Sequence, residues 1–593
     1  MKAKEQKGAE AWSKTRRRQN RRRSAWETTW AEENTEIGEK VMLKKKWMSL
    51  IALALASVML LSACAKNGGN DQKDNNDDGG GTSTGGEVVK DANELVIGTY
   101  MPVTTLVPWK TTSDGDGYIL RQIYHTLVEM DQDSNFVPSL ATEWECSEDG
   151  LTWTVKIRDD VYWQTGNGLF DEKVKVTAED VKFSYEYYLD PANGSVRYTE
   201  LSNSLKEINV VDEQTVQFVT NDIDVLWEYK MYQNYIIPRQ AVEQNWDFEN
   251  KPVGSGAYKF VEHVIDSQVV LERNDEFYKE PALDKVIFKI ISDKSVSAIA
   301  LQNQEVDMSL SVLPTEVGNI VNKDYLELRA SEVGSYRWIG FNCQYEFFQD
   351  AELRRALTMA VDMNSAVEAI FKNDAGVTLA KRAYGPISYE RPGGDEERFK
   401  AVCIEYDPKE AEKLLDELGW KKGSDGIRAK DGQKLSFTLQ VGNNDSNREN
   451  LAVVVSSQLK AIGVDCTAQT VEWGTHTDDI KNGNVQMYIL GGYSNLDGPY
   501  RLMHTSDTMS PNCGYSNPEV DALLDEAWRT IDIDERSELQ TQAAEIFIAD
   551  APHIFGYFEY TQMGVSKAVT DFEQASVYRS LCNEFRNVGV NHK

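Results

Sequence analysis

The chain has 593 residues, of which 41% are hydrophobic and 10% aromatic, so most of it carries enough apolar material to bury a large core. Its formal net charge is −32, but residues 1–49 hold 14 basic and 7 acidic side chains, whereas the part from Cys64 onward holds 49 basic and 88 acidic ones. An acidic body repels phosphate groups, which argues against nucleic acid and anionic lipid as partners.

The first 41 residues contain two runs of three arginines, at 16–18 and 21–23. Such basic segments occur in arms that bind nucleic acid. A secretory signal follows, however, and signals of this kind start near the N-terminus of a protein. We therefore expect translation to begin at Met42 and residues 1–41 to be an upstream segment included by a misassigned start.

Residues 42–63 have the order of a signal peptide: Lys44, Lys45 and Lys46, then an apolar run at 48–61, then Ser62 and Ala63. The run is shorter than the roughly 20 residues that a membrane-spanning helix needs. The sequence Leu-Ser-Ala-Cys at 61–64 resembles a bacterial lipobox, which implies cleavage before Cys64 and acylation of its thiol. The alternative is an ordinary signal peptide with an incidental cysteine. Residues 65–86 are rich in Gly, Asn, Asp, Ser and Thr, so we expect residues 64–92 to form an acylated, flexible linker.

Strand and helix signals intermix from residue 93 to the end. Apolar runs or alternating apolar residues predict strands at 95–100, 153–157, 208–218 (a hairpin) and 286–290. In the segment 406–420, Asp407 and Pro408 predict a helix start, Glu410 would complete a capping box, and Gly419 marks the end. The segment 516–528 repeats this design. We therefore expect one continuous α/β body without a second linker.

Known catalytic and metal-binding motifs are missing from the sequence. The six histidines form no HExxH pattern, no GxxxxGK[ST] loop occurs, and the one GxSxG match, at 81–85, lies in the linker. None of the seven cysteines lies within four residues of another, so zinc-knuckle spacings are absent as well. Apart from Cys64 we expect buried free thiols, although the sequence does not reveal any pairing. We expect no catalytic residues, no metal and no cofactor.

The chain resembles the extracellular solute-binding proteins, family 5, which serve ABC importers. The signature segment runs from 137 to 188, and its matching residues are Pro138, Leu140, Ala141, Trp144, Asp149, Gly150, Trp153, Arg158, Thr177, Ala178, Asp180, Val181, Phe183 and Ser184. Further matches follow in the expected order, at 252–260 (with Ser255 and Ala257 departing from the pattern), 301–308, 341–362, 406–420, 458–465 and 516–527. The likeness covers nearly all of the chain after residue 93.

This resemblance implies an α/β fold of the periplasmic-binding-protein type (class C), in which two lobes are joined by two hinge strands. We expect the first lobe at 93–337, with an extra subdomain at about 128–245, the second lobe at 338–555, and a return to the first lobe at 556–593. The crossings should lie near 338–342 and 554–560. Ligand contacts from both lobes would stabilise a closed state that the importer recognises.

The resemblance also implies where the ligand lies, namely between residues 100–109 and the segment 491–502. The expected contacts are Tyr100, Met101, Leu106, Trp109, Gly491, Gly492, Tyr493, Ser494, Asn495 and Asp497. In peptide-binding relatives a peptide adds as a strand to the second segment, and an aspartate meets its ammonium group. Asn495 stands at that position here, and a neutral amide cannot neutralise a desolvated ammonium. Asp497 lies two residues on and is a candidate replacement.

The function implied is that of a monomeric, non-enzymatic lipoprotein at the outer face of a bacterial cytoplasmic membrane. It would capture peptides, in particular oligopeptides, and pass them to the permease and ATPase subunits of an ABC transporter. Three alternatives remain at this point: an oligosaccharide or other solute bound by the same fold, a receptor that senses peptides without transporting them, and an exported hydrolase. Nickel and haem are disfavoured because histidines are scarce.

Overall fold

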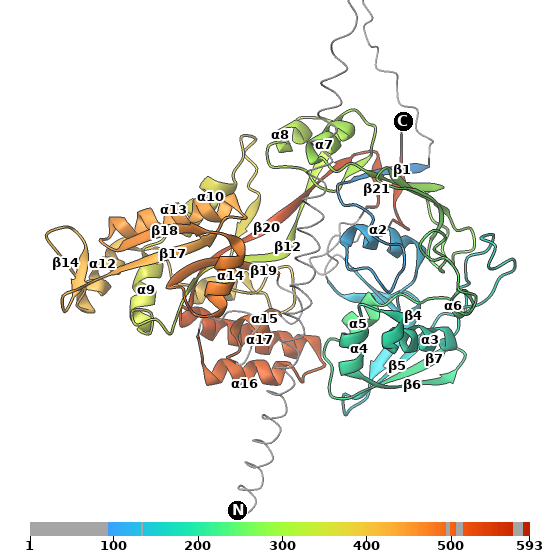
Figure 1. Ribbon diagram of the computed structural model, residues 1–593, viewed down its shortest axis with the longest axis horizontal. Coiled ribbons are helices and arrows are strands. Elements are labelled where there is room, and N and C mark those ends of the chain that lie inside the picture. Colours follow the sequence, from blue (N-terminus) through green and yellow to red (C-terminus); the bar gives the residue numbers. More distant parts are fainter. Residues whose placement is uncertain (1–92, 132–133, 494–497, 506–513, 573–584, 593) are drawn as a thin grey trace, which may run out of the picture. The chain divides into compact units, whose positions relative to one another are not determined.

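The computed structural model describes residues 93–131, 134–493, 498–505, 514–572 and 585–592, all of which belong to one compact unit at 87–593 (Figure 1). The expected signal peptide at 42–63, Cys64 and the tract up to residue 92 lie outside the described residues. Among the residues that are described, no helix combines the length and the apolar character that a bilayer span requires.

The strand expected near the start of the body is β1 (Glu94–Thr99). Leu95, Val96 and Ile97 are buried on both faces of it, which fits a continuous apolar run inside a parallel sheet. β1 pairs in parallel with β10 (Lys285–Ile290) and with β11 (Met308–Ser309). Antiparallel strands β9 (Gln268–Arg273) and β8 (Tyr258–Val264) extend the sheet beyond β10.

Two long strands connect this part of the sheet with a second part. β12 (Leu326–Phe341) and β20 (His553–Ser566) pair antiparallel from Leu326↔Ser566 to Gly340↔His553 (Figure 1). Beyond β12 lie β19 (Met487–Tyr493), β17 (Ser436–Gly442) and β18 (Asp465–Val471), while β13 (Ala380–Arg382) pairs with β20. The crossings expected at 338–342 and 554–560 fall within this pairing, except that Asn342 lies one residue beyond β12.

The buried apolar residues form four clusters. The first contains β1, β8, β9, β10 and the end of β20, and the fourth gathers around Val96, Leu301 and Leu326. Ile339 and Phe341 of β12 belong to the second cluster, whereas Tyr336 and Trp338 belong to the third. Because alternate residues of a strand point to opposite faces, the second and third clusters lie on the two faces of the sheet beyond β12.

A separate antiparallel sheet occurs within the segment where the extra subdomain was expected. Its order is β4 (Ala141–Cys146), β5 (Thr152–Ile157), β7 (Thr215–Thr220) and β6 (Leu205–Asp212). The predicted hairpin at 208–218 is the β6–β7 pair. Trp153, Val155 and Ile157 of β5 are buried, as their alternation with polar residues indicated.

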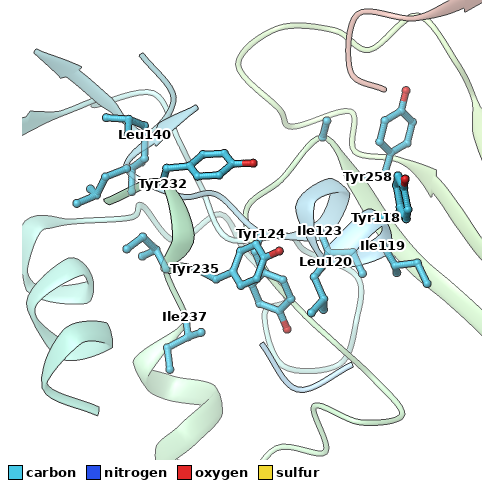
Figure 2. Close-up of a cluster of buried hydrophobic side chains, with 14 of the residues drawn as sticks. Tyr118, Ile119, Leu120, Ile123, Tyr124, Leu140, Tyr232, Tyr235, Ile237 and Tyr258 are labelled. Carbon is cyan, nitrogen blue, oxygen red and sulfur yellow. The ribbon is translucent and has the colours of Figure 1, made fainter. Parts of the chain in front are cut away.

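Helix α2 (Asp114–Ile123) places Tyr118, Ile119, Leu120 and Ile123 in the first cluster (Figure 2). Figure 2 also shows Tyr124, which follows the helix, beside Tyr235; their ring centroids are 5.8 Å apart. The polar start of the same helix carries Asp114 and Asp116. The apolar face of α2 therefore packs in the first cluster, while Asp116 at its start bonds to Thr104 in the loop that follows β1.

The two helices with predicted starts are α12 (Pro408–Glu417) and α16 (Pro518–Ala527), and both carry proline in the first turn. Asp407 caps α12 by accepting from the N–H groups of Lys409 and Glu410. The expected capping box was wrong for α12, because the Asp407 N–H donates to the Met359 carbonyl and the Glu410 carboxylate pairs with Lys413. A capping box does form at α3 (Ala178–Leu189), between Thr177 and Asp180.

The other described elements complete the layers. The helices are η1 (Pro191–Asn193), α4 (Tyr198–Ser204), α5 (Trp227–Gln233), α6 (Arg239–Glu243), α7 (Lys294–Gln302), α8 (Val317–Val321), α9 (Ala351–Met359), α10 (Met363–Phe371), α11 (Glu396–Val402), α13 (Ser446–Ala461), α14 (Trp473–Lys481), α15 (Gly498–Met503) and α17 (Ile533–Ala549). The remaining strands are β2 (Val128–Met130), β3 (Phe136–Pro138), β14 (Lys421–Lys422), β15 (Arg428–Lys430), β16 (Gln433–Lys434), β21 (Val569–Thr570) and β22 (Gly589–Val590).

Four cysteines lie among the described residues, and none of them forms a disulfide there. Cys466 is buried, whereas Cys146, Cys343 and Cys403 are half-buried. The expected free thiols are therefore found for these four, but the expected burial holds only for Cys466. Cys513 and Cys582 lie outside the described residues.

Candidate functional site

The strands β17, β18 and β19 run parallel, so their carboxyl ends meet at one edge of the sheet. These ends are Gly442, Val471 and Tyr493. In open α/β sheets, ligands bind at the edge where the carboxyl ends of parallel strands meet. β1, β10 and β11 also run parallel, and the loop that follows β1 begins at their shared carboxyl edge. The fold thus offers two edges at which a ligand can be held.

Gly491 and Gly492 lie on β19 opposite Arg337 and Tyr336 of β12. A Cβ atom added to Gly491 would come within 2.2 Å of Arg337 Cδ, because the arginine side chain lies across this glycine. A Cβ atom added to Gly492 would meet nothing closer than Trp338 at 3.8 Å. The two neighbouring glycines therefore differ: a side chain at Gly491 would displace Arg337 from its present position, whereas one at Gly492 would make only ordinary contacts with Trp338.

Four charged side chains form a cluster beside Gly491. Arg337 Nη2 donates to Glu559 Oε2 at 2.8 Å, and Arg448 Nε donates to Asp445 Oδ2 at 2.7 Å. Burial raises the pKa of Glu559, and the Arg337 charge opposes this shift. Burial is the largest single influence on Asp445 and raises its pKa, but the hydrogen bonds and charge of Arg448, with the Arg337 charge, together outweigh burial and leave that pKa below its ordinary value.

The charges of this cluster balance, and an aromatic side chain borders it. The guanidinium carbon of Arg448 lies 5.4 Å from the ring centroid of Trp473, the first residue of α14. The Nε atom of Arg337 is buried and has no hydrogen-bond partner among the described residues. Because protein atoms cover this donor, it could meet a carbonyl or carboxylate oxygen of a ligand only after the Arg337 side chain moves.

The loop after β1 is held in place by two carboxylates. Asp116 of α2 is fully buried and accepts from the N–H and hydroxyl of Thr104 at 2.7 and 2.6 Å, and from the Thr111 hydroxyl at 2.8 Å. Glu249 accepts from the Thr105 hydroxyl at 2.6 Å and from the Leu106 N–H at 3.2 Å. The loop therefore has a fixed conformation at the carboxyl edge of β1.

Residues 135–512 match the sequence profile of the bacterial extracellular solute-binding proteins, family 5 (middle region). The chain belongs to this family. The oligopeptide-binding protein AppA of Bacillus subtilis is 28% identical over 499 residues, which cover 82% of this chain and 89% of AppA. The solved structure of B. subtilis AppA in complex with a nonapeptide has a TM-score of 0.57 and 26% identity, and covers 84% of this chain and 98% of that one.

HbpA2 from Haemophilus parasuis has the same fold as this family 5 protein. Its solved structure superimposes with a TM-score of 0.74 at 21% identity, covering 84% of this chain and 100% of that one. The α/β fold inferred from the sequence is confirmed by these comparisons, and the family consists of solute-binding proteins.

The predicted contacts in the loop after β1 have different surroundings. Leu106 is fully buried, and Trp109 is 7% exposed and packs edge-on against Tyr187 and Phe248, with centroids 5.0 Å away in both cases. Both side chains belong to the first core cluster. In this conformation they support the loop from behind and offer no surface to a ligand.

Tyr100 and Met101, by contrast, are only half-buried. The Lys294 ammonium lies 4.0 Å from the ring centroid of Tyr100, and partial burial lowers the pKa of this lysine. Gly491 and Gly492 are half-buried at the edge of β19, and the backbone of Tyr493 pairs with Ser335. Ser494, Asn495 and Asp497 lie outside the described residues, so their role as contacts stays a prediction.

The sequence analysis missed Arg337, Asp445, Arg448 and Glu559. A local signal existed for one pair: Asp445 is followed three residues later by Arg448 at the start of α13, which is a capping position that also holds an ion pair. No local signal existed for Arg337 and Glu559, because 222 positions separate them and only the β12–β20 register brings them together.

Proposed function

We propose that this family 5 protein is the substrate-binding component of an ABC importer and that it captures oligopeptides between its two lobes. The observation that carries the proposal is the half-buried carboxyl end of β19 at Gly491 and Gly492, beside the balanced cluster around Arg337. Polypeptide backbone can add to such a strand end, and balanced charges favour a ligand with both charged and neutral groups. The similarity to AppA, whose solved structure contains a nonapeptide, supports the same ligand class.

The lobes in this proposal are residues 93–337 with a subdomain at about 128–245, residues 338–555, and the returning segment 556–593. The separate core clusters support this division, because the first and fourth gather around β1 and the second and third around β17 and β19. β12 and β20 are the hinge strands. Closure of the lobes around the peptide would create the form that the permease and ATPase subunits recognise.

Location at the membrane is part of the same proposal. The lipobox-like sequence at 61–64 supports cleavage before Cys64, acylation of that cysteine and retention of a monomer at the outer face of the bacterial cytoplasmic membrane. The polar tract at 65–86 would act as a tether of variable length. Binding drives a change in lobe orientation in this scheme, and no covalent bond in the ligand is broken.

Native mass spectrometry of the protein purified without denaturation tests the ligand class. We expect bound species whose released masses correspond to a mixture of peptides, and we expect isothermal titration with those peptides to give saturable binding at one site. Identification of a single glycan or of a metal complex in place of peptides would reject the peptide proposal. Turnover of added peptides would reject the non-enzymatic part.

A further inference from the structure

Glu332 lies on hinge strand β12 at the point where its pairing with β20 becomes irregular. The register is regular from Leu326↔Ser566 to Glu332↔Tyr560, and the next pair is Tyr336↔Phe558. Between these two pairs, three residues of β12 (333–335) oppose one residue of β20 (Glu559), which is a bulge. Bulges bend a strand and interrupt the hydrogen-bonded ladder. The side chain of Glu332 is thus attached to the least regular part of the strand pair that joins the two sets of core clusters.

The Glu332 side chain is sealed from solvent and has no hydrogen-bond partner in the described residues. Its exposed fraction is 0%, and neither Oε1 nor Oε2 makes a hydrogen bond of normal geometry; the nearby Ser388 hydroxyl acts on its pKa without reaching that geometry. A buried carboxylate in this position would lose its hydration without any compensating bond, which strongly favours the neutral acid. A buried polar group without a partner is rare in a folded protein and calls for a specific explanation.

Three charged side chains act on Glu332, namely Lys381, Glu390 and Arg391. Lys381 of β13 pairs with Glu396 of α11 at 2.6 Å. Glu390 and the buried Arg391 belong to the segment 383–394 that follows β13, and Tyr560 is the β20 residue opposite Glu332.

Burial is the main cause that raises the pKa of Glu332, to about 7. The Glu390 charge acts in the same direction, and Ser388, Lys381 and Arg391 oppose it without reversing it. Burial raises the pKa of Glu390 as well, and it raises that of Tyr560 to about 12, with Glu332 adding to the effect.

We propose that Glu332 is a proton-operated switch of the hinge. The protonated side chain stays sealed beneath segment 383–394, and loss of its proton to solvent drives the side chain out of this position. The pairing of β12 with β20 is then lost next to the bulge. As a result, the two lobes change their relative orientation more freely. The inference depends on the two-lobed fold and not on which solute is bound, so it can fail while the proposed peptide binding stands.

The direction and size of the pH dependence follow from the two states of the carboxyl group. A solvated glutamate has a pKa near 4.5, and the sealed one has a pKa of about 7. Between these two pH values, Glu332 is protonated in the sealed conformer and deprotonated in the opened one. The ratio of opened to sealed conformers therefore rises up to tenfold per pH unit from about pH 4.5 to about pH 7, and it levels off above pH 7.

Small-angle X-ray scattering of the ligand-free protein at pH 5 and pH 8 tests this switch, with Glu332→Gln as the variant that mimics the protonated acid. We expect the radius of gyration of the unmodified protein to change between the two pH values, and that of E332Q to remain at its pH 5 value. Glu327→Gln is the matched control, because Glu327 lies on the same strand but is partly exposed and pairs with Arg329 at 2.6 Å. E327Q should keep the pH response of the unmodified protein.

A pH response in E332Q equal to that of the unmodified protein, or no response in either, would overturn the proposal. Hydrogen exchange of the unmodified protein provides a measurement that does not depend on any variant. After correction for the intrinsic exchange rate, amides of 327–341 and 558–566 should lose protection between pH 5 and pH 8 while amides of β17 do not. Equal changes in both regions would contradict the switch.

Discussion

Gly491 and Gly492 are adjacent on one strand and yet have different reasons to be glycine. A methyl group at Gly491 would overlap the side chain of Arg337, whereas one at Gly492 finds space beside Trp338. We expect Gly491→Ala to displace Arg337 from Glu559 and to weaken binding of the co-purified ligand by about tenfold or more, equivalent to roughly 1.4 kcal/mol. Isothermal titration calorimetry measures this loss.

Gly492→Ala is the matched control for that substitution. Because the added Cβ would make only ordinary contacts, at 3.8 Å or more, the affinity should stay within about twofold of the unmodified value. Equal affinities in the two variants would show that Arg337 does not take part in binding. Circular dichroism of both variants establishes that the comparison is made between folded proteins.

At the scale of single residues, the contacts expected from the sequence have different positions in the structure, and their role in binding stays a prediction. Gly491 and Gly492 were predicted from a motif, and they lie at the carboxyl edge of β19. Leu106 was expected as a ligand contact and is fully buried in this structure, in a loop that Asp116 and Glu249 hold in place. Arg337 and Glu559 carry no sequence signal, since their pairing arises only from long-range strand register.

At the scale of elements, sequence patterns at helix starts predict the capping residue correctly but not every hydrogen bond of the cap. Asp407 caps α12 through two backbone N–H groups, each at 3.0 Å, while Glu410 bonds to Lys413 and not to the cap. Asp407→Ala should therefore lower the free energy of unfolding by about 1 kcal/mol, because two N–H groups at the start of the helix lose their side-chain acceptor. Chemical denaturation followed by far-UV circular dichroism measures the change.

Glu410→Gln distinguishes a single cap from the capping box that the sequence suggested. In the structure this change removes only a surface ion pair with Lys413, so we expect a loss of a few tenths of a kcal/mol at most. A loss as large as that of D407A would mean that Glu410 does bond to the cap in solution. The same comparison explains the sequence error: the S/T/D-x-x-E pattern is present, but the Met359 carbonyl already accepts from the cap N–H.

The positions of many strands and helices along the chain could be predicted from the sequence, whereas the strands with which each one pairs could not. The runs at 95–100, 153–157 and 286–290 became β1, β5 and β10, because alternating or continuous burial imposes these patterns. β1 pairs with β10, about 190 residues away in the chain, and local patterns contain no information about such a partner. Only the resemblance to a known family supplied the crossing strands.

For the whole molecule, the core clusters on the two sides of the hinge strands predict how a ligand changes unfolding. Without ligand, the part around β1 and the part around β17 and β19 each have their own core, so calorimetry should resolve two overlapping transitions. A ligand that contacts both lobes binds only when both are folded. At 100 times its dissociation constant it contributes about 2.7 kcal/mol, which raises the melting temperature by about 5 °C and merges the transitions.

The same measurement separates binding by two lobes from binding by one. A ligand held by β19 alone would stabilise the part that contains β17 and β19 and leave the other transition at its original temperature, because mass action stabilises only the folded unit that binds. G491A at the same ligand concentration should show a smaller shift in both transitions, since its affinity is lower. A shift of one transition only would refute closure of the lobes around the ligand while leaving the site at the β19 edge intact.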